Sequence, residues 1–394
     1  MRRYGAVLVV AAALAAVLPP ASASAAIDPY ALTLEQQVGQ LLMVGVPATG
    51  VDAAGLRQVA RFHVGAVILT GRARGGVAAT ARVAALLQGR AAIPLLVAAD
   101  QEGGAVQGLS GPGFDAIPSA LDQGGAATAT LRRRARTWGH QLRQAGVLVD
   151  LAPVADTVPA GAHNPPIGGH DRQFGSAPVG VATHAGAVAR GLADAGVAPT
   201  VKHFPGLGRV TADTDSRGGV TDAVTTRTDA YLTPFRHAIG AGRPFVMMSN
   251  AVYARIDATR PAAFSPTVID GMLRGDLGFD GVVVSDDLGE ARQVSGVAVG
   301  DRATRFVAAG GDLVLTVDPA TLPVMYAALL TRARADAAFR LRVQQSVQRI
   351  LLAKQRLGLV GAPARRTPGP VRYAFGPVRE TARPAAGRAV RMAR

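Results

Sequence analysis

Short apolar runs recur along the chain and alternate with longer stretches of helical spacing. Most runs are rich in Val, Leu and Ile, which is typical of strands buried on both faces of a parallel sheet. The eight predicted strands are Leu41–Val46, Val64–Leu69, Pro94–Ala99, Val147–Pro153, Pro199–His203, Phe245–Ser249, Gly281–Ser285 and Asp312–Val317. We expect helices between them, most clearly at Ala127–Ala145, Ala177–Ala195 and Leu322–Leu357, and a capping box at Thr33–Gln36 opens the first helix.

Eight β–α units in succession predict the α/β class and a (β/α)8 TIM-type barrel, formed as a single domain by residues 27–360. The length of this segment suits one such domain. A doubly wound parallel sheet is the alternative. No glycine fingerprint follows the first predicted strand, so the barrel is favoured.

The first 26 residues have the pattern of a secretory signal peptide. Arg2 and Arg3 precede the apolar segment Ala6–Leu18, and small residues follow at Ala21–Ala23. The apolar segment is too short to cross a bilayer reliably. We therefore expect a secreted, extracytoplasmic protein with no membrane span once the signal is removed. The chain has no cysteine, which excludes disulfides and a lipid-modified cysteine.

The last segment, residues 361–394, is basic and rich in Pro, Ala and Gly. It holds eight arginines and one glutamate, and so contributes +7 to the formal net charge of +15. Because it lacks apolar periodicity, we interpret it as a disordered tail. Its charge fits either a merely solvated tail or a tether to an anionic cell-envelope polymer. No interleaving of aromatic and basic residues suggests a nucleic-acid partner.

Polar and ionisable residues follow six of the eight predicted strands. In a barrel, the carboxyl ends of the strands and the loops after them build the active site. The residues at these ends are Asp100–Glu102, Asp156, Lys202–His203, Asn250, Asp286–Asp287 and Asp318.

The segment Lys202–Gly208 is the most informative of these. It places a cation, an imidazole and a glycine-bounded loop just before two carboxylates, Asp213 and Asp215. The chain has only two lysines against forty arginines, so a lysine here indicates that a compact ammonium is needed. The layout suits a site that binds an uncharged polar ligand such as a sugar.

Asp286, Asp100 and Arg172 complete the candidate set, each with a structural alternative. Asp286 directly follows an apolar strand and suits a nucleophile, although one residue of the Asp286–Asp287 pair also suits a helix cap. Asp100, before two glycines, can accept hydrogen bonds from sugar hydroxyls or simply stabilise its loop. Arg172 can donate to a ligand oxygen or form a surface ion pair.

Together these motifs resemble glycoside hydrolase family 3 β-N-acetylglucosaminidases, in order and over residues 30–320. The Lys-His-Phe-Pro-Gly motif distinguishes this single-domain branch from the family's β-glucosidases. The matching segments are Asp100–Gly104, Leu151–Asp156, Asn164–Pro165, Ile167–Gly168, Arg172–Gly175, Lys202–Gly208 and Ser285–Leu288.

The resemblance implies a retaining exo-enzyme that removes terminal GlcNAc from peptidoglycan fragments or related glycans. Asp286 would attack the anomeric carbon and form a glycosyl-enzyme, and the loop after the fifth strand would supply the acid/base. The family's sugar-binding residues correspond to Asp100, Arg172, Lys202 and His203. Neither a metal nor an organic cofactor is implied.

Two departures from the family pattern bear on the mechanism. The usual loop has a histidine where Leu207 stands, and it ends in Asp-Ser-His where this chain has Asp213-Thr214-Asp215. The acid/base is therefore Asp215, Asp213 or absent. Two arginines that usually follow Gly103-Gly104 are also missing. These departures leave a non-catalytic or weakly active sugar-binding relative as the alternative, and a hydrolase for other sugars as a third possibility.

Overall fold

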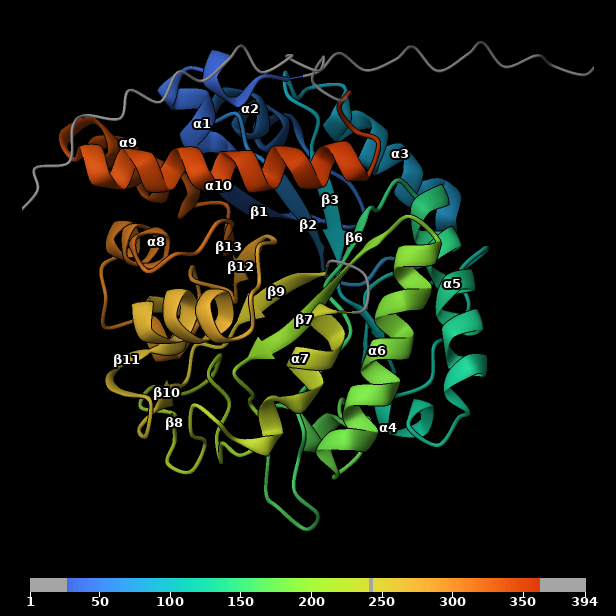
Figure 1. The fold of residues 1–394 in the computed structure, drawn as a ribbon. Coiled ribbons are helices and arrows are strands. Elements are labelled where there is room, and N and C mark those ends of the chain that lie inside the picture. The colour runs from blue at the N-terminus through green and yellow to red at the C-terminus, as the bar shows by residue number, and fades with distance from the viewer. Residues whose placement is uncertain (1–26, 241–243, 362–394) are drawn as a thin grey trace, which may run out of the picture. The chain divides into compact units, whose positions relative to one another are not determined.

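The computed structural model describes residues 27–240 and 244–361 (Figure 1). The predicted signal peptide and all but the first residue of the predicted tail lie outside the described residues. Among the described residues, no helix has the length and apolar character needed to cross a membrane.

Eight parallel strands form the centre of the fold, and the predicted (β/α)8 barrel is confirmed. Neighbouring strands pair in the order β12-β9-β7-β6-β3-β2-β1-β13. A bridge between Val284 and Leu313 joins the two ends of this order and closes the barrel. The strands are β1 (Leu42–Pro47), β2 (Ala66–Thr70), β3 (Leu96–Ala99), β6 (Val149–Asp150), β7 (Ala198–Phe204), β9 (Phe245–Met248), β12 (Val283–Ser285) and β13 (Val314–Thr316).

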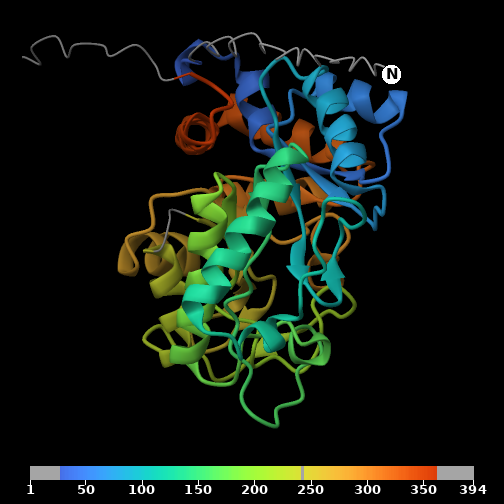
Figure 2. The ribbon, with the colours of Figure 1, turned by 90° about the vertical axis from the view of Figure 1, so that its right-hand side faces the viewer.

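Helices surround the strands and connect each one to the next (Figure 2). They cover the outer face of the barrel, and the strands are consequently buried on both sides. The helices in these connections are α2 (Ala53–Arg61), α3 (Gly76–Gln88), α4 (Ala120–Gln123), α5 (Thr128–Gln144), α6 (Pro178–Asp194), α7 (Thr233–Ile239), the π-helix η5 (Thr267–Asp276) and α8 (Val299–Ala308). Helix α9 (Leu322–Ala335) follows the last strand.

Short strands outside the barrel shape the loops at its carboxyl end. A hairpin of β4 (Gln101–Gly103) and β5 (Val106–Gln107) follows β3. A three-stranded sheet of β8 (Thr221–Asp222), β10 (Val252–Tyr253) and β11 (Asp257–Pro261) joins the loops after β7 and β9. These additions build the walls around the ends of the strands.

The helix predictions are confirmed except at one place. Thr33 and Gln36 form the expected capping box at α1 (Leu34–Gln40), and α5 and α6 lie within their predicted ranges. The single helix predicted over Leu322–Leu357 is wrong, because the chain breaks at Asp336 into α9 and α10 (Ala337–Arg356). Asp336 has extended backbone angles and its carboxylate accepts from Phe339 N (3.0 Å), so it caps α10.

The two ends of the barrel differ in what covers them. Helices α1 and α10 lie across the amino end of the strands, and the long loops gather at the carboxyl end (Figure 1). At the amino end the chain packs closely, since a Cβ on Gly65 would lie 2.0 Å from Gln40 O. The carboxyl end holds the candidate site.

Candidate active site

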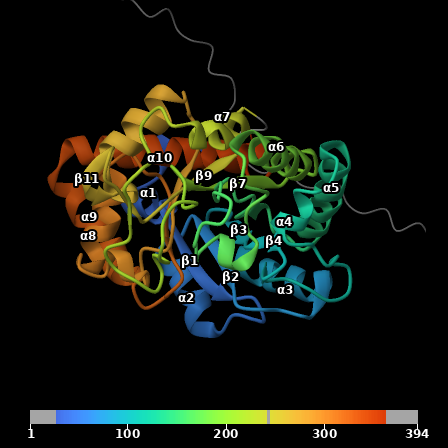
Figure 3. The same ribbon diagram turned by 90° about the horizontal axis from the view of Figure 1, so that it is seen from below.

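The carboxyl ends of the strands bring the predicted site residues to one end of the barrel (Figure 3). Asp100 directly follows β3, Lys202 and His203 lie in β7, and Asp286 directly follows β12. Arg172 reaches the same region from the loop between β6 and α6. The peptide bond between Lys202 and His203 is cis.

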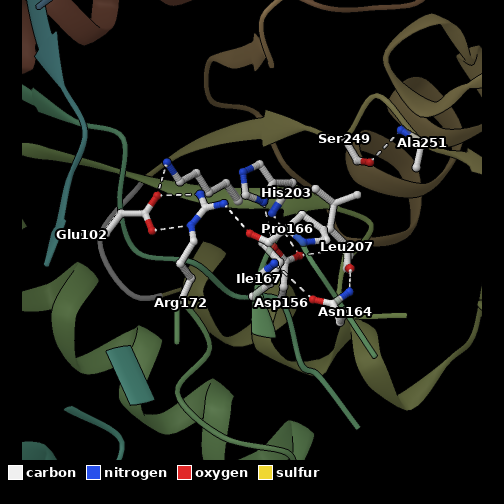
Figure 4. Close-up of polar contacts among 12 residues, drawn as sticks. Glu102, Asp156, Asn164, Pro166, Ile167, Arg172, His203, Leu207, Ser249 and Ala251 are labelled. Carbon is white, nitrogen blue, oxygen red and sulfur yellow. Dashed lines mark hydrogen bonds and ion pairs between the residues drawn. The ribbon is translucent and has the colours of Figure 1, made fainter. Parts of the chain in front are cut away.

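Lys202 lies between two carboxylates and is almost completely buried. Its Nζ is 2.6 Å from Asp100 Oδ1 and 2.7 Å from Glu102 Oε1. Arg172 binds the same Glu102 in a bidentate manner, with Nε and Nη2 each 2.8 Å from a carboxylate oxygen (Figure 4). Both oxygens of Glu102 thus have protein partners, whereas the Asp100 side chain is 38 % exposed and remains accessible to a ligand.

The charges in this network are stabilised by one another. Burial disfavours the ionised form of Glu102, but the neighbouring Arg172 and Lys202 outweigh it and hold the pKa of Glu102 well below its usual range. Burial likewise opposes the charge on Lys202, but Asp100 and Glu102 raise the pKa of Lys202. Lys202 is therefore a permanent ammonium at neutral pH.

Asp156 orients His203 and the start of the loop after β7. The His203 Nδ1 lies 2.7 Å from Asp156 Oδ2, and His203 N donates to Asp156 Oδ1 (3.1 Å). Leu207 N donates to the same oxygen (2.8 Å). With Nδ1 engaged by a carboxylate, the second ring nitrogen of His203 remains as the one that can bind a ligand.

The carboxylate of Asp286 is held at the end of β12. Its Oδ1 accepts from Asp287 N (2.9 Å), and its own N donates to Met248 O (3.2 Å) on the neighbouring strand. Burial raises the pKa of Asp286, although His203 and Lys202 act in the opposite direction. Asp286 therefore lies within the field of both β7 residues.

Asp287 has a different role from its neighbour, as expected for the structural residue of the pair. Its Oδ1 accepts from Gly289 N (3.0 Å) and Val317 N (2.9 Å), and its Oδ2 accepts from Glu290 N (2.9 Å). Asn250 Nδ2 in turn donates to Asp287 O (3.1 Å). These bonds fix the loop that follows Asp286 and so fix the direction of the Asp286 side chain.

Asp215 lies in the electrostatic field of Asp286. Partial burial, and then the carboxylates of Asp286, Asp213 and Asp287, raise the pKa of Asp215 to about 7. Asp215 is nevertheless exposed. Asp213 Oδ1 accepts from Asp215 N (2.9 Å), so Asp213 shapes the turn that presents Asp215.

The loop that holds Asp215 is tied to the loop after β12. Arg292 N donates to Asp215 O (3.1 Å), and Gln293 N donates to Thr214 O (3.0 Å). The Gln293 side chain also exchanges two hydrogen bonds with the Val220 backbone. Because the loop after β12 starts at Asp286, these bonds couple the positions of Asp215 and Asp286.

Leu207 stands at the position of the usual loop histidine and has a structural role. Its side chain is buried, and its carbonyl and that of Val210 accept from Asn164 Nδ2 (2.8 and 2.9 Å). A Cβ on Gly208 would lie 1.8 Å from Thr157 O, so the chain must pass close to the loop after β6 here. Leu207 therefore anchors the loop.

The hairpin that lacks the usual arginines is closed by other contacts. Gln107 donates to Leu109 O (3.1 Å) and Asp115 O (2.8 Å) and accepts from Ile117 N (2.9 Å), so it stabilises the hairpin. Arg72, from the loop after β2, donates to Ala105 O (2.8 Å). A guanidinium therefore reaches this part of the rim from a neighbouring strand.

Sequence reasoning missed the roles of three buried acids. Glu102 and Asp156 were visible as polar residues after strands, but nothing local indicated that they bind Arg172, Lys202 and His203. Asp150 lies in β6 and accepts from Gln101 N (3.2 Å). Burial raises its pKa well above the usual value, against the opposing effect of Lys202.

The chain was compared with known proteins. The model of the glycosyl hydrolase family 3 N-terminal domain matches residues 33–353. This chain belongs to glycosyl hydrolase family 3. Within the described residues, no group of three or more His, Cys, Asp or Glu side chains is arranged to hold a metal ion.

Family 3 relatives with similar sequence and structure are named hexosaminidases. The β-hexosaminidase LpqI of Mycobacterium tuberculosis is 33% identical over 345 residues, which cover 86% of this chain and 87% of LpqI. The crystal structure of β-N-acetylhexosaminidase from Beutenbergia cavernae is 48% identical, with a TM-score of 0.80 over 82% of this chain and 98% of that one. A family 3 β-N-acetylglucosaminidase from Paenibacillus is 35% identical, with a TM-score of 0.78 over 86% of this chain and 65% of that one. The predicted family and glycoside hydrolase class are thereby confirmed.

Proposed function

We propose that this family 3 protein is a secreted, retaining exo-β-N-acetylglucosaminidase in which Asp286 is the nucleophile and Asp215 the acid/base. The observation that carries the proposal is the effect of Asp286 on the pKa of Asp215, which burial and neighbouring carboxylates raise to about 7. A carboxyl group that keeps its proton near neutral pH beside an ionised carboxylate is the arrangement that glycosidases use.

In the first step, Asp286 attacks the anomeric carbon and forms a covalent ester while the bond to the leaving oxygen breaks. Asp215 gives its proton to that oxygen, and the aglycone leaves as an alcohol. In the second step, Asp215 removes a proton from water, which attacks the same carbon and releases Asp286. We expect the two carboxyl groups to be about 5 Å apart in the substrate complex.

Four residues are proposed to hold the GlcNAc ring. Asp100 and the buried Lys202 can bind vicinal hydroxyls, since the exposed Asp100 oxygen accepts and the ammonium donates. Arg172 holds Glu102 and so keeps Lys202 in place, and it can donate to the ligand from the cleft side. The free nitrogen of His203 can accept from a hydroxyl next to the reacting carbon.

Peptidoglycan fragments are the proposed substrates. Two exposed arginines, Arg217 and Arg292, adjoin the acid/base: Arg217 N donates to Asp213 O (2.9 Å), and Arg292 N donates to Asp215 O (3.1 Å). The aglycone leaves past Asp215, so its carboxylate, such as the lactyl group of a muramyl sugar, would meet these guanidinium groups. The signal pattern in residues 1–26 supports secretion, where such fragments occur.

The test uses 4-nitrophenyl β-GlcNAc and a GlcNAc-containing disaccharide with the full chain. Asp286→Ala should lower kcat on both substrates by about 10⁴-fold or more. Asp215→Asn should lower kcat on the disaccharide by about 10²–10⁴-fold. The first step on the aryl glycoside should change little, because nitrophenolate leaves without a proton, but water then attacks the glycosyl-enzyme slowly without the base. Unchanged turnover by Asp286→Ala would refute the proposal.

Azide separates Asp215 from Asp213. Azide needs no general base, so it should restore turnover of the aryl glycoside by Asp215→Asn and yield a β-glycosyl azide. Asp213→Asn is the matched control, since it removes a neighbouring carboxylate while leaving Asp215 in place. If azide rescues Asp213→Asn and not Asp215→Asn, the two roles must be exchanged.

The alternative is a sugar-binding relative that has lost catalysis. Leu207 in place of the loop histidine and the missing hairpin arginines favour it. Saturable binding of GlcNAc without turnover of either substrate would support this alternative. Turnover of the aryl glycoside alone by the unmodified chain would indicate a weakened acid in a working enzyme.

A further inference from the structure

Three successive barrel helices carry a large excess of positive charge. Helices α5, α6 and α7 hold seven arginines and a single acidic residue, Asp194. Five of the arginines are on α5, which has no acidic residue and exposes no large apolar side chain. Figure 2 shows α5 on the outer surface of the barrel.

Three of these arginines converge on Asp194. Arg132 takes both of its oxygens, with Nε 2.7 Å from Oδ2 and Nη2 3.0 Å from Oδ1. Arg136 and Arg190 also lie close enough to lower the pKa of Asp194, although its hydrogen bond with Arg132 is the larger cause. One carboxylate therefore faces three guanidinium groups, and we call Arg132, Arg136 and Arg190 the arginine cluster.

Two members of the arginine cluster have an imidazole as a hydrogen-bond partner. Arg136 Nε lies 3.3 Å from His140 Nε2, and Arg190 Nη1 lies 3.4 Å from His237 Nε2. Since a guanidinium is always a donor, each imidazole must accept through an unprotonated nitrogen. A guanidinium normally binds a carboxylate or a phosphate more strongly than an imidazole. The cluster thus has donors to offer to an incoming anion.

The arginines on the other side of the barrel are different. Arg342 of α10 pairs with Asp270, Arg334 of α9 pairs with Glu35, and Arg349 of α10 lies 3.0 Å from Asp312 Oδ1. These three arginines each have a carboxylate partner, whereas Arg136 and Arg190 contact an imidazole.

We propose that the arginine cluster, extended by Arg143 along α5, binds a linear polyanion that carries phosphate groups. The guanidinium fork matches phosphate, and the α5 arginines extend over about 16 Å, from Arg132 to Arg143. Arg143 Nη1 donates to Gly196 O (2.8 Å), so it lies across the end of α6, in line with the cluster. A bilayer is a poorer fit, since α5 has no exposed large apolar side chain to insert.

The test measures binding of fluorescently labelled long-chain inorganic polyphosphate to the full chain by anisotropy at low salt. Arg136→Glu/Arg190→Glu should weaken binding at least about tenfold and reduce its dependence on salt. The matched control is Arg305→Glu/Arg340→Glu, which reverses two exposed arginines of α8 and α10. Because net charge and the basic residues 361–394 are the same in both, the control should bind at least about tenfold more tightly than the first variant.

Hydrolysis of an aryl β-GlcNAc, or circular dichroism if no turnover is found, verifies that both variants are folded. Equal weakening in the two variants would overturn the proposal, because binding would then follow net charge alone. Unchanged binding in Arg136→Glu/Arg190→Glu would also overturn it. Tighter binding to vesicles of anionic phospholipid than to polyphosphate, lost in the same variant, would replace the polymer by a membrane surface.

Discussion

The only two lysines of the chain lie at opposite ends of the barrel, and both are buried. Lys202, at the carboxyl end, contacts Asp100 and Glu102 at 2.6 and 2.7 Å, and these carboxylates raise its pKa. Lys354, at the amino end, donates to one neutral acceptor, Gln40 Oε1 (2.6 Å), and burial lowers its pKa to about 7. The same side chain is thus a permanent cation at one end and titrates near neutrality at the other.

The comparison shows which end of the barrel is built for chemistry. At the carboxyl end, each buried charge lies next to a charge of opposite sign, which is an arrangement suited to binding a polar ligand. At the amino end, α1 and α10 close the barrel, and the buried ammonium of Lys354 contacts no ligand-accessible surface. Replacing each lysine by methionine should therefore have opposite effects.

The largest effect is expected for Lys202→Met. It removes the donor to Asp100 and one of the two cations that bind Glu102, so kcat/KM should fall about 10²-fold or more. The free energy of unfolding should decrease by about 3–5 kcal/mol, as for other broken buried ion pairs. Kinetics with an aryl β-GlcNAc and urea denaturation measure the two effects. Retention of both activity and stability would show that Lys202 is not part of the site.

A smaller effect is expected from pH. Asp215 must be protonated to act as the acid, and its pKa is raised to about 7, so kcat/KM on a disaccharide should fall about tenfold per pH unit above 7. Burial raises the pKa of Asp286, so activity should also fall at acid pH as this nucleophile gains a proton. The two limits belong to the coupled pair.

Asp215→Asn serves as the control for this profile. With no ionisable acid/base, its residual activity on the disaccharide should lose the alkaline limb and keep the acid one. An alkaline limb that persists unchanged in Asp215→Asn would assign it to another group, and the proposed acid would then be wrong.

The barrel could be predicted because its signal is local. Each central strand, such as β2 or β9, is buried on both faces and therefore appears as a continuous apolar run. The break at Asp336 was not predicted, because apolar spacing continues across it from α9 to α10. There, one carboxylate that accepts from Phe339 N outweighs the helical pattern.

The candidate site could be predicted only in part, for a related reason. Lys202 and Asp286 stand out because each follows or ends an apolar strand, and their motifs resemble those of a known family. Glu102 gives no such signal, since its partner Arg172 is 70 residues away in the sequence. The field that raises the pKa of Asp215 likewise arises only when the loops after β7 and β12 meet.

The smallest effect on activity, and a gain in stability, is expected for Lys354→Met. The pKa of Lys354 is about 7 in the folded protein and about 10.4 in the unfolded chain, so the unfolded state binds more protons between these values. The buried charge therefore lowers the free energy of unfolding by its full amount below pH 7, and the free energy of unfolding rises as the pH increases toward 10. Lys354→Met removes the cost and should raise the free energy of unfolding at pH 7 by about 1–4 kcal/mol.

The pH dependence of this gain distinguishes a charge effect from better packing. Urea denaturation of both proteins at several pH values should show the advantage of Lys354→Met shrinking between pH 7 and 10, because Lys354 becomes neutral in both states. Activity should stay unchanged, since α10 contributes nothing to the cleft. A gain that is independent of pH would mean that burial does not lower the pKa of Lys354 in the folded protein and that methionine merely packs better. A loss of stability would show that the bond to Gln40 outweighs the cost of burial, and the contrast between the two lysines would then lie in their partners alone.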